Sequence, residues 1–394
     1  WRNVNPTDKT SGITNAIVSP IRNQGSYGTC WAFGAVASLE ASYNAQLRAA
    51  GLPSGVDLSE RYLAWLTFAL PVDGKKTDGF YYSNVSESDH SGMSYTNHIF
   101  NQGSTNWMTV PTLVRYGLPS EKEYPYVKTG NTCMQGVSRC EHSGAALHDL
   151  LNVMPTTKDT TSPYYLKNAV DYYKKLLQEV GVMEVSYLAG KANKNRRDIC
   201  NTNTIAVTHA VSIVGWDDDH ILHNPDGSVM TDAEGKVLKG AWIIRNSWGN
   251  YLPGPISTTD PDSNGYFYIS YKDSTLSKGT PFIAETDAGR YTQVDTNAPG
   301  GAYYHYNGCY FNAPQEQGNY RFAHKLTSGS SQFLKAAGFY VPADAMSYQI
   351  TVSLKGTAPD KQSVIYTKSG TFGQDGTSVY KGYRTVDFDK FVYI

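Results

Sequence analysis

The sequence lacks a surplus of charge of either sign. Its 34 lysine and arginine residues almost balance its 35 aspartate and glutamate residues, which leaves a net charge of −1. Proteins that bind nucleic acid usually carry a basic surplus, so this balance argues against nucleic acid as a partner. The chain also lacks an apolar run of about 20 residues, the length that a membrane helix needs. We therefore predict no transmembrane segment.

Cysteine is scarce, and its spacing excludes the common cysteine-based metal centres. None of the five cysteines forms a Cys-x-x-Cys pair, which argues against zinc and iron–sulfur sites. The odd number leaves at least one thiol without a partner in the chain. Cys133 and Cys140 are close enough in sequence for a local disulfide, and Cys200 could pair with Cys309, as would suit an oxidising compartment. Five reduced thiols are the alternative.

The chain does not begin like a secreted precursor. Trp1-Arg2-Asn3 leads into polar residues rather than into the apolar core of a signal peptide. We expect a mature fragment, with a leader or propeptide upstream of it.

The 394 residues exceed one typical domain, and a hydrophobic fraction of 40% is sufficient for packed cores. Up to about residue 285, apolar periodicity predicts four helices and four strands. The helices fall at 30–51, 59–69, 109–116 and 168–180, and the strands at 182–187, 206–216, 240–245 and 265–271.

Beyond about residue 285 only short alternating runs remain, as in Tyr348, Ile350, Val352 and Leu354, which share one face of a strand. The expected fold class is therefore α+β, with a mixed domain over 1–285 and an all-β sandwich over 286–394. The last predicted strand runs to the final residue, so we expect this second domain to be trimmed at its C-terminus.

Four side chains form a pattern that suits nucleophilic catalysis. Cys30 opens the first predicted helix, where unpaired N–H groups and the helix dipole favour a thiolate. His209 enters an apolar strand and could act as its base, and Asn246 follows another apolar strand and could orient the imidazole. Gln24, together with the backbone N–H of Cys30, could stabilise an oxyanion.

The segments around these residues resemble those of papain-family cysteine proteases. Residues 24–33, QGSYGTCWAF, resemble the nucleophile segment of that family, and THAV at 208–211 resembles its histidine segment. NSWG at 246–249 resembles its asparagine segment, and NGYF at 264–267 the strand beyond it. The resemblance covers roughly the first 280 residues.

This resemblance implies a helical lobe and a β-barrel-like lobe with the catalytic residues in the cleft between them. It implies a cysteine endopeptidase that acts through a thiolate and an acyl-enzyme. Cys30 would be the nucleophile, His209 the general acid and base, Asn246 the residue that orients the histidine, and Gln24 an oxyanion donor. Trp248 would pack over the histidine–asparagine pair.

Two departures from the family pattern affect what we expect of the cleft. Tyr27 stands where many members have a disulfide-bonded cysteine, so the helical lobe must be held by packing. Gly103 is followed by Ser104 where the family has a second glycine, which places a side chain in the cleft. The expected substrate-binding residues are Gly103, Ser104, Thr208 and Trp248.

The C-terminal part has a looser resemblance. GFYV at 338–341 and GYRTVD at 382–387 resemble the lectin-like domain that follows the protease in some bacterial cell-surface cysteine proteases, including enzymes that process surface-layer protein. This implies a secreted or cell-surface location, a protein or peptide substrate and an inhibitory propeptide. Binding of a cell-wall glycan and simple packing against the protease are equal alternatives for the β-domain.

Two other functions are kept as alternatives: a carbohydrate- or cell-wall-binding surface protein with a degenerate protease domain, and hydrolysis or transfer of non-peptide amides. No cofactor and no metal in the catalytic site are expected. DPDSNG at 260–265 resembles the first half of a calcium loop, but Tyr271 occupies the twelfth position, where such a loop needs glutamate. A turn is the favoured interpretation, and a structural calcium ion is the lesser one.

Overall fold

The computed structural model describes residues 17–68, 99–101, 103–127, 137, 144–151, 166–190, 196–202, 204, 206–252, 265–277, 279–285, 333–341, 346–354, 364–372 and 382–393. The predictions made for Trp1-Arg2-Asn3, for a Cys133–Cys140 disulfide and for the calcium-like segment before Gly265 lie outside these residues.

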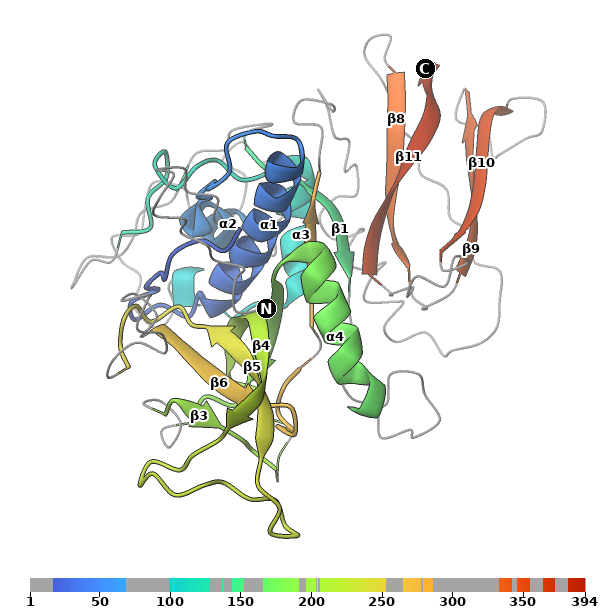
Figure 1. Cartoon of the computed structure of the whole chain (residues 1–394). Coiled ribbons are helices and arrows are strands. Elements are labelled where there is room, and N and C mark those ends of the chain that lie inside the picture. Colours follow the sequence, from blue (N-terminus) through green and yellow to red (C-terminus); the bar gives the residue numbers. More distant parts are fainter. Residues whose placement is uncertain are drawn as a thin grey trace.

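A helical lobe is built around one long buried helix (Figure 1). It contains α1 (Cys30–Ala49), α2 (Glu60–Leu66), the 3₁₀ turn η2 (Ile99–Asn101) and α3 (Asn106–Arg115). The predicted all-round apolar character of α1 is confirmed, because nearly every residue in its first four turns is buried. Ser59 caps α2 by accepting a hydrogen bond from the Tyr62 N–H at 3.0 Å.

Tyr27 is held in this lobe by aromatic packing. Its side chain is only 5% exposed, and its ring lies 5.7 Å from that of Phe100 and 6.5 Å from that of Tyr126. Trp65 continues the same cluster at 5.7 Å from Phe100. The packing expected at the position of the family disulfide is therefore present.

The second lobe is a five-stranded sheet covered by a helix. The strand order is β2 (Met183–Tyr187), β4 (His209–Ile221), β5 (Lys239–Arg245), β6 (Tyr266–Ser270) and β3 (Asp198–Ile199). All pairs are antiparallel except β3 with β6. Helix α4 (Leu166–Val180) packs against this sheet through Tyr173 and Leu177, both of which are buried.

Between β4 and β5 the chain forms three short segments that share an eight-residue spacing. Leu222, Met230 and Leu238 are buried, and their backbones are joined in a ring. The Leu222 N–H donates to Leu238, that of Met230 to Leu222 and that of Leu238 to Met230, over 2.8 to 3.1 Å. Gly227 and Gly235 occupy equivalent turn positions with positive φ. This repeat was not identified from the sequence.

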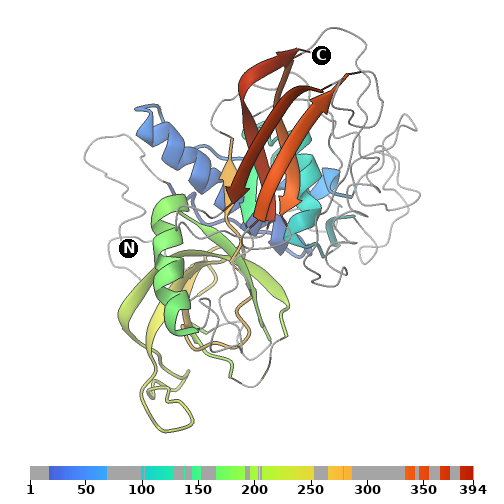
Figure 2. The ribbon, with the colours of Figure 1, turned by 90° about the vertical axis from the view of Figure 1, so that its right-hand side faces the viewer.

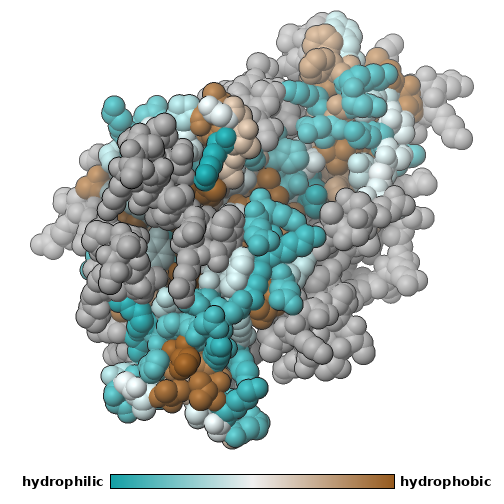
Figure 3. Space-filling view, viewed as in Figure 1, coloured by the Kyte–Doolittle hydropathy of each residue, from teal (hydrophilic) through white to brown (hydrophobic). Residues whose placement is uncertain are grey.

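The residue before each buried member of the repeat is an exposed β-branched one: Ile221, Val229 and Val237. Figure 3 shows hydrophobic side chains gathered at the end of the molecule where Figure 1 places this segment.

The C-terminal strands are antiparallel, as their alternating pattern predicts. They are β8 (Phe333–Val341), β9 (Met346–Ser353), β10 (Val364–Phe372) and β11 (Gly382–Tyr393). In β9 the half-buried Tyr348, Ile350 and Val352 alternate with exposed polar residues. The β9–β10 pair contacts β8 through Phe339, whose ring centroid lies 5.8 Å from that of Tyr348 and 5.9 Å from that of Phe372. Figure 2 shows these C-terminal strands beside one another.

One C-terminal strand joins a sheet of the preceding part of the chain. The order of this sheet is β7 (Phe282–Ala284), β1 (Leu147–Leu151), β11 and β8. Leu150 pairs with Tyr383 and Leu151 with Gly382. The sheet thus crosses the boundary predicted at residue 285.

Cys30 and Cys200 both carry free thiols. The considered pairing of Cys200 with Cys309 is therefore wrong. Among the described residues, no helix combines the length and the apolar character needed to cross a membrane.

The junction of β11 with β1 depends on a glycine. Gly382 has a φ of +152°, and a Cβ there would lie 1.9 Å from the Leu150 carbonyl oxygen. We expect Gly382→Ala to destabilise the junction by about 1–3 kcal/mol, because the strand must shift away from β1. Thermal unfolding and limited proteolysis between the two parts would measure this.

Gly190→Ala is the matched control, since no atom lies within 4 Å of a Cβ at that position. Equal unfolding temperatures for the two variants would contradict the described pairing.

Candidate active site

Cys30 is the first residue of α1 and is half-buried. Burial raises the pKa of its thiol, while backbone N–H groups of Ala210 and Trp31 donate to the sulfur and act in the opposite direction. The contact with Ala210 places the sulfur against the residue next to His209. The helix start and the first residues of β4 therefore meet at this point, as the sequence predicts.

His209 and Asn246 form a buried pair. The antiparallel register of β4 and β5, in which Ser212 pairs with Arg245, brings the start of one strand beside the end of the other. The His209 Nε2 lies 2.8 Å from the Asn246 Oδ1. The Asn246 Nδ2 donates to the Tyr251 hydroxyl at 2.9 Å, so the amide is held at both ends. Because Nε2 is engaged, Nδ1 is the ring nitrogen that can exchange a proton with a thiol.

Trp248 covers this pair. Its ring stacks on the imidazole at 4.5 Å between centroids with an angle of 23° between planes. The Tyr187 ring also contacts the imidazole edge-on, at 5.9 Å between centroids. The predicted role of Trp248 as a cover that keeps water from the histidine–asparagine hydrogen bond fits this arrangement.

Gln24 is fixed by hydrogen bonds to the segment that carries Asn246. Its N–H donates to the Ser247 carbonyl at 2.7 Å, and its Oε1 accepts from the Ser247 hydroxyl at 2.6 Å. Its Nε2 donates to the Tyr27 carbonyl at 2.7 Å. A carboxamide nitrogen carries two hydrogens, so one remains to donate to a bound group.

Burial disfavours a charge on either the thiol or the imidazole alone. It lowers the pKa of His209 to about 4, although the hydrogen bond with Asn246 opposes this, and it raises the pKa of Cys30. In this structure burial therefore opposes both a lone thiolate on Cys30 and a lone imidazolium on His209.

Of the predicted substrate-binding residues, Thr208 directly precedes His209 and Trp248 stacks on its ring, while Gly103 and Ser104 follow Asn101, which contacts the nucleophile segment. Gly28, two residues before Cys30, donates its N–H to the Asn101 Oδ1 at 3.1 Å, so the segment leading to Gly103 and Ser104 runs beside the nucleophile segment. No atom lies within 4 Å of the position that a Cβ would take at Gly103, so the space beside this residue is open. Thr208 is exposed, and its hydroxyl accepts from the Ala189 N–H at 3.0 Å.

Sequence reasoning missed Glu184. This carboxyl on β2 is 2% exposed and accepts a hydrogen bond from Asn106 at the start of α3. Its Cγ would lie 2.5 Å from a Cβ at Gly34, so α1 can approach β2 only because residue 34 is glycine. A glutamate inside an otherwise apolar strand was the signal that could have revealed it.

The profile of the family described as "Papain family cysteine protease" matches residues 6–64 and 96–276. This is more than half of the chain, and the chain belongs to the papain family of cysteine proteases.

Two of the curated relatives are plant cysteine proteases. The oryzain gamma chain of Oryza sativa subsp. japonica is 28% identical over 255 residues, which cover 64% of this chain and 52% of that protein. Cysteine proteinase 2 of Zea mays is 27% identical over 235 residues, with coverages of 60% and 50%. The chain spans about half the length of the curated relatives it matches.

Two solved structures extend the likeness to the C-terminal strands. The cysteine protease and lectin-like domains of Cwp84, a surface layer associated protein of Clostridium difficile, match with a TM-score of 0.56 and 19% identity over 98% of this chain and 70% of that chain. Clostridial Cwp84 after propeptide cleavage matches with a TM-score of 0.53 and 20% identity over 98% and 79%. The predicted α+β fold, a papain-like part with a further sheet domain, is confirmed.

Glu184 gives the stability of the fold a pH dependence. Burial raises its pKa to about 8, against the opposing hydrogen bond from Asn106, whereas an unfolded glutamate titrates at about 4.3. Between these values the folded chain retains a proton that the unfolded chain has released, so stability falls as the pH rises.

We expect Glu184→Gln to match the wild type near pH 4.5 and to exceed it at pH 8 by on the order of 1–4 kcal/mol, as measured by urea unfolding. Glu179→Gln, at an exposed carboxylate on α4, is the control. If the free energy of unfolding changed between pH 4.5 and pH 8 by the same amount in Glu184→Gln as in the wild type, the assignment would be contradicted.

Proposed function

We propose that this chain is a cysteine endopeptidase that hydrolyses peptide bonds of proteins at the cell surface or outside the cell. The observation that carries the proposal is the contact of the Cys30 sulfur with the N–H of Ala210, the residue after His209, beside the buried His209–Asn246 pair and with Gln24 bound to Ser247. Each of these residues has a common structural explanation when taken alone. Their joint placement supports catalysis.

In this proposal the Cys30 sulfur gives its proton to the His209 Nδ1 and attacks the carbonyl carbon of the peptide. The bond between that carbon and the leaving nitrogen then breaks as His209 returns the proton to the amine. A water molecule, deprotonated by His209, attacks the resulting thioester and releases the acid. Asn246 keeps the imidazole in the required orientation throughout. Side chains and backbone groups supply every step, so the reaction needs no cofactor.

The oxyanion formed in each addition step would be bound by two donors. One is the second hydrogen of the Gln24 Nε2, and the other is the backbone N–H of Cys30 at the start of α1. The Gln24 amide cannot rotate freely, because its oxygen accepts from Ser247 and its nitrogen donates to Tyr27. Such fixed donors stabilise developing charge without reorganisation.

We place the substrate between the segment of Gly103 and Ser104 and the segment of Thr208 and Trp248. Gly103 is exposed with an open side, as main-chain pairing with an extended peptide requires. Ser104 is half-buried, and its hydroxyl donates to the Thr105 carbonyl at 3.2 Å. This wall of the cleft is therefore polar, and we expect tolerance of polar residues in the substrate.

We further propose that residues 1–285 form the peptidase and 286–394 a lectin-like β-domain, with the shared β1–β11 pairing fixing one to the other. The Cwp84 structures support an extracellular or surface location and release from an inhibitory propeptide, since they include a surface layer associated protein and a form after propeptide cleavage. A cell-wall glycan is the proposed partner of the C-terminal strands.

Replacement of the proposed nucleophile tests the function most directly. We expect Cys30→Ala to abolish cleavage of a denatured protein and labelling by an epoxide thiol reagent, because Cys30 supplies the sulfur of the proposed thioester. Cys200→Ala removes the second free thiol and should change neither readout.

Cleavage by Cys30→Ala at a rate near that of the wild type would contradict the proposal. An inactive wild type that retains glycan binding would favour the carbohydrate-binding alternative.

The oxyanion donor gives a graded test. We expect Gln24→Ala to lower kcat by about 10²–10³-fold, the usual cost of losing one such donor. Gln24→Glu keeps the acceptor for the Ser247 hydroxyl but places a negative charge at the oxyanion, so it should lose at least as much. Gln349→Ala, on exposed β9, is the control, and steady-state kinetics on a peptide amide is the measurement. A wild-type kcat in both Gln24 variants would remove this residue from the mechanism.

A further inference from the structure

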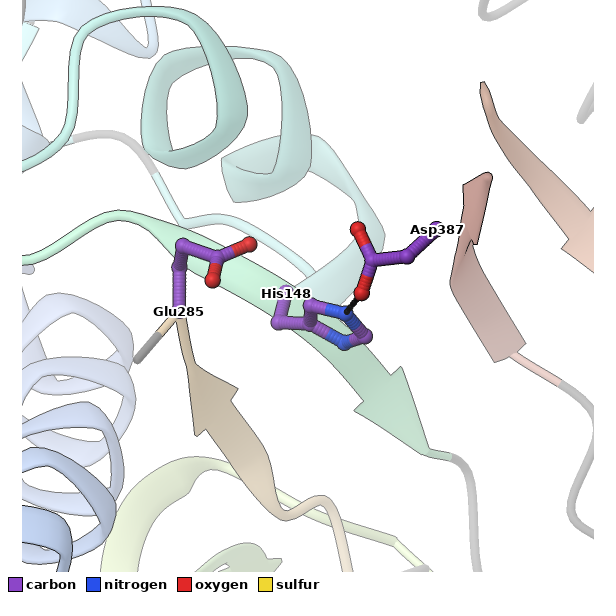
Figure 4. A group of neighbouring side chains, drawn as sticks. All are labelled: His148, Glu285 and Asp387. Carbon is purple, nitrogen blue, oxygen red and sulfur yellow. Dashed lines mark hydrogen bonds and ion pairs between the residues drawn. The ribbon is translucent and has the colours of Figure 1, made fainter. Parts of the chain in front are cut away.

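A second cluster of ionisable side chains lies away from the thiol, where the C-terminal strand β11 joins the sheet of β1 and β7. It consists of His148 on β1, Glu285 directly after β7, and Asp387 on β11 (Figure 4). One ligand atom from each residue lies within 4.8 Å of the other two. The three elements are neighbours in the strand order β7-β1-β11, which brings the three residues to one sheet.

The separation of the first two ligand atoms is that of a long hydrogen bond or ion pair, and it also suits a shared metal ion. The His148 Nε2 and the Asp387 Oδ2 are 3.4 Å apart. Hydrogen bonds from nitrogen to oxygen span about 2.7–3.2 Å. Two ligands that each lie about 2.0–2.2 Å from a tetrahedral zinc ion are about 3.3–3.6 Å from one another. The observed distance falls in the second range.

The other nitrogen of His148 is already oriented by a carboxylate. Its Nδ1 lies 3.2 Å from the Asp149 Oδ1. Two residues of β11 position Asp149 in turn. Its Oδ1 accepts a hydrogen bond from the Thr385 N–H at 2.8 Å, and its Oδ2 lies 3.2 Å from the Arg384 Nε. A carboxylate behind a histidine is the usual arrangement around protein zinc ions, because it fixes the ring and leaves Nε2 for the metal.

The cluster combines a buried floor with an open side. Glu285 is only 5% exposed, whereas the Asp387 side chain is 58% exposed and that of His148 is 23% exposed. An ion could enter from solvent and retain water as a fourth ligand.

We propose that His148, Glu285 and Asp387 bind a divalent transition-metal ion of the zinc class, which fastens β11 to the sheet of the peptidase. The imidazole ligand distinguishes this site from a calcium site, because calcium takes oxygen ligands. The site differs in position and composition from the calcium-like segment at 260–265.

A proton competes with the metal for the same nitrogen. Burial acts to lower the pKa of His148, but the carboxylates of Asp149, Glu285 and Asp387 outweigh it and raise the pKa to about 9. A metal ion must displace this proton to reach Nε2, so zinc affinity should rise with pH, and binding is measured at pH 8 because displacement is easier there than at acidic pH.

The test uses the full chain in a Cys30→Ala, Cys200→Ala background, so that neither free thiol takes up metal. Zinc titration calorimetry and metal content after dialysis should show one equivalent that His148→Ala removes, with affinity lowered by about 100-fold or more. Cobalt(II) in place of zinc should give the visible absorption of a four-coordinate site. Zinc should raise the unfolding temperature of the background protein and not that of the variant.

Two further variants separate loss of the site from loss of the fold. Asp387→Asn changes an exposed side chain and should lose the same equivalent while remaining folded. His220→Ala is the matched control, because His220 makes a short contact of 2.7 Å with Asp198, in the range of a direct hydrogen bond, and should keep the zinc. Equal zinc binding by the background protein and by both site variants, or no binding by any of them, would overturn the proposal and leave His148 as an ion-pair residue.

Discussion

The contact between the start of α1 and the start of β4 is the interaction on which the rest of this molecule depends. The helix supplies Cys30 and the strand supplies His209, and the sulfur rests against the N–H of Ala210. One turn after Cys30, Gly34 lets the same helix approach Glu184 on the neighbouring strand β2. Packing between the two lobes therefore sets the geometry of the chemistry.

The same contact between lobes buries carboxyl groups, which couples the site to pH. Glu40 on α1 accepts hydrogen bonds from Ser19 and from the Leu58 N–H, and Arg245 on β5 partly offsets the burial that raises its pKa to about 7. Glu184 lies under the same helix with a pKa raised to about 8. These groups make the interface specific, because a displaced helix would leave buried polar atoms unsatisfied. The stability of the fold therefore falls as the Glu40 and Glu184 carboxyl groups lose their protons with rising pH.

The C-terminal strands are part of the framework and are not simply appended to it. β11 pairs with β1, and β1 pairs with β7, which runs against α1. Asp149 receives a hydrogen bond from the Thr385 N–H across this junction. A change in the C-terminal strands can thus reach the helix that carries Cys30 through two strand pairings. A metal ion at His148 would strengthen the first of these links.

Local sequence determined the helices, the strand pattern and the identity of the residues that meet around Cys30, because capping, periodicity and short motifs act over a few neighbouring residues. It also contained the eight-residue repeat at 221–239, which was overlooked. Only the tertiary structure decided that Glu184 lies beneath Gly34, that β11 pairs with β1, and that His148 faces Asp387. Those contacts join residues more than a hundred positions apart, and which of many compatible strand edges and apolar faces meet is decided by packing of the whole chain rather than by any local preference.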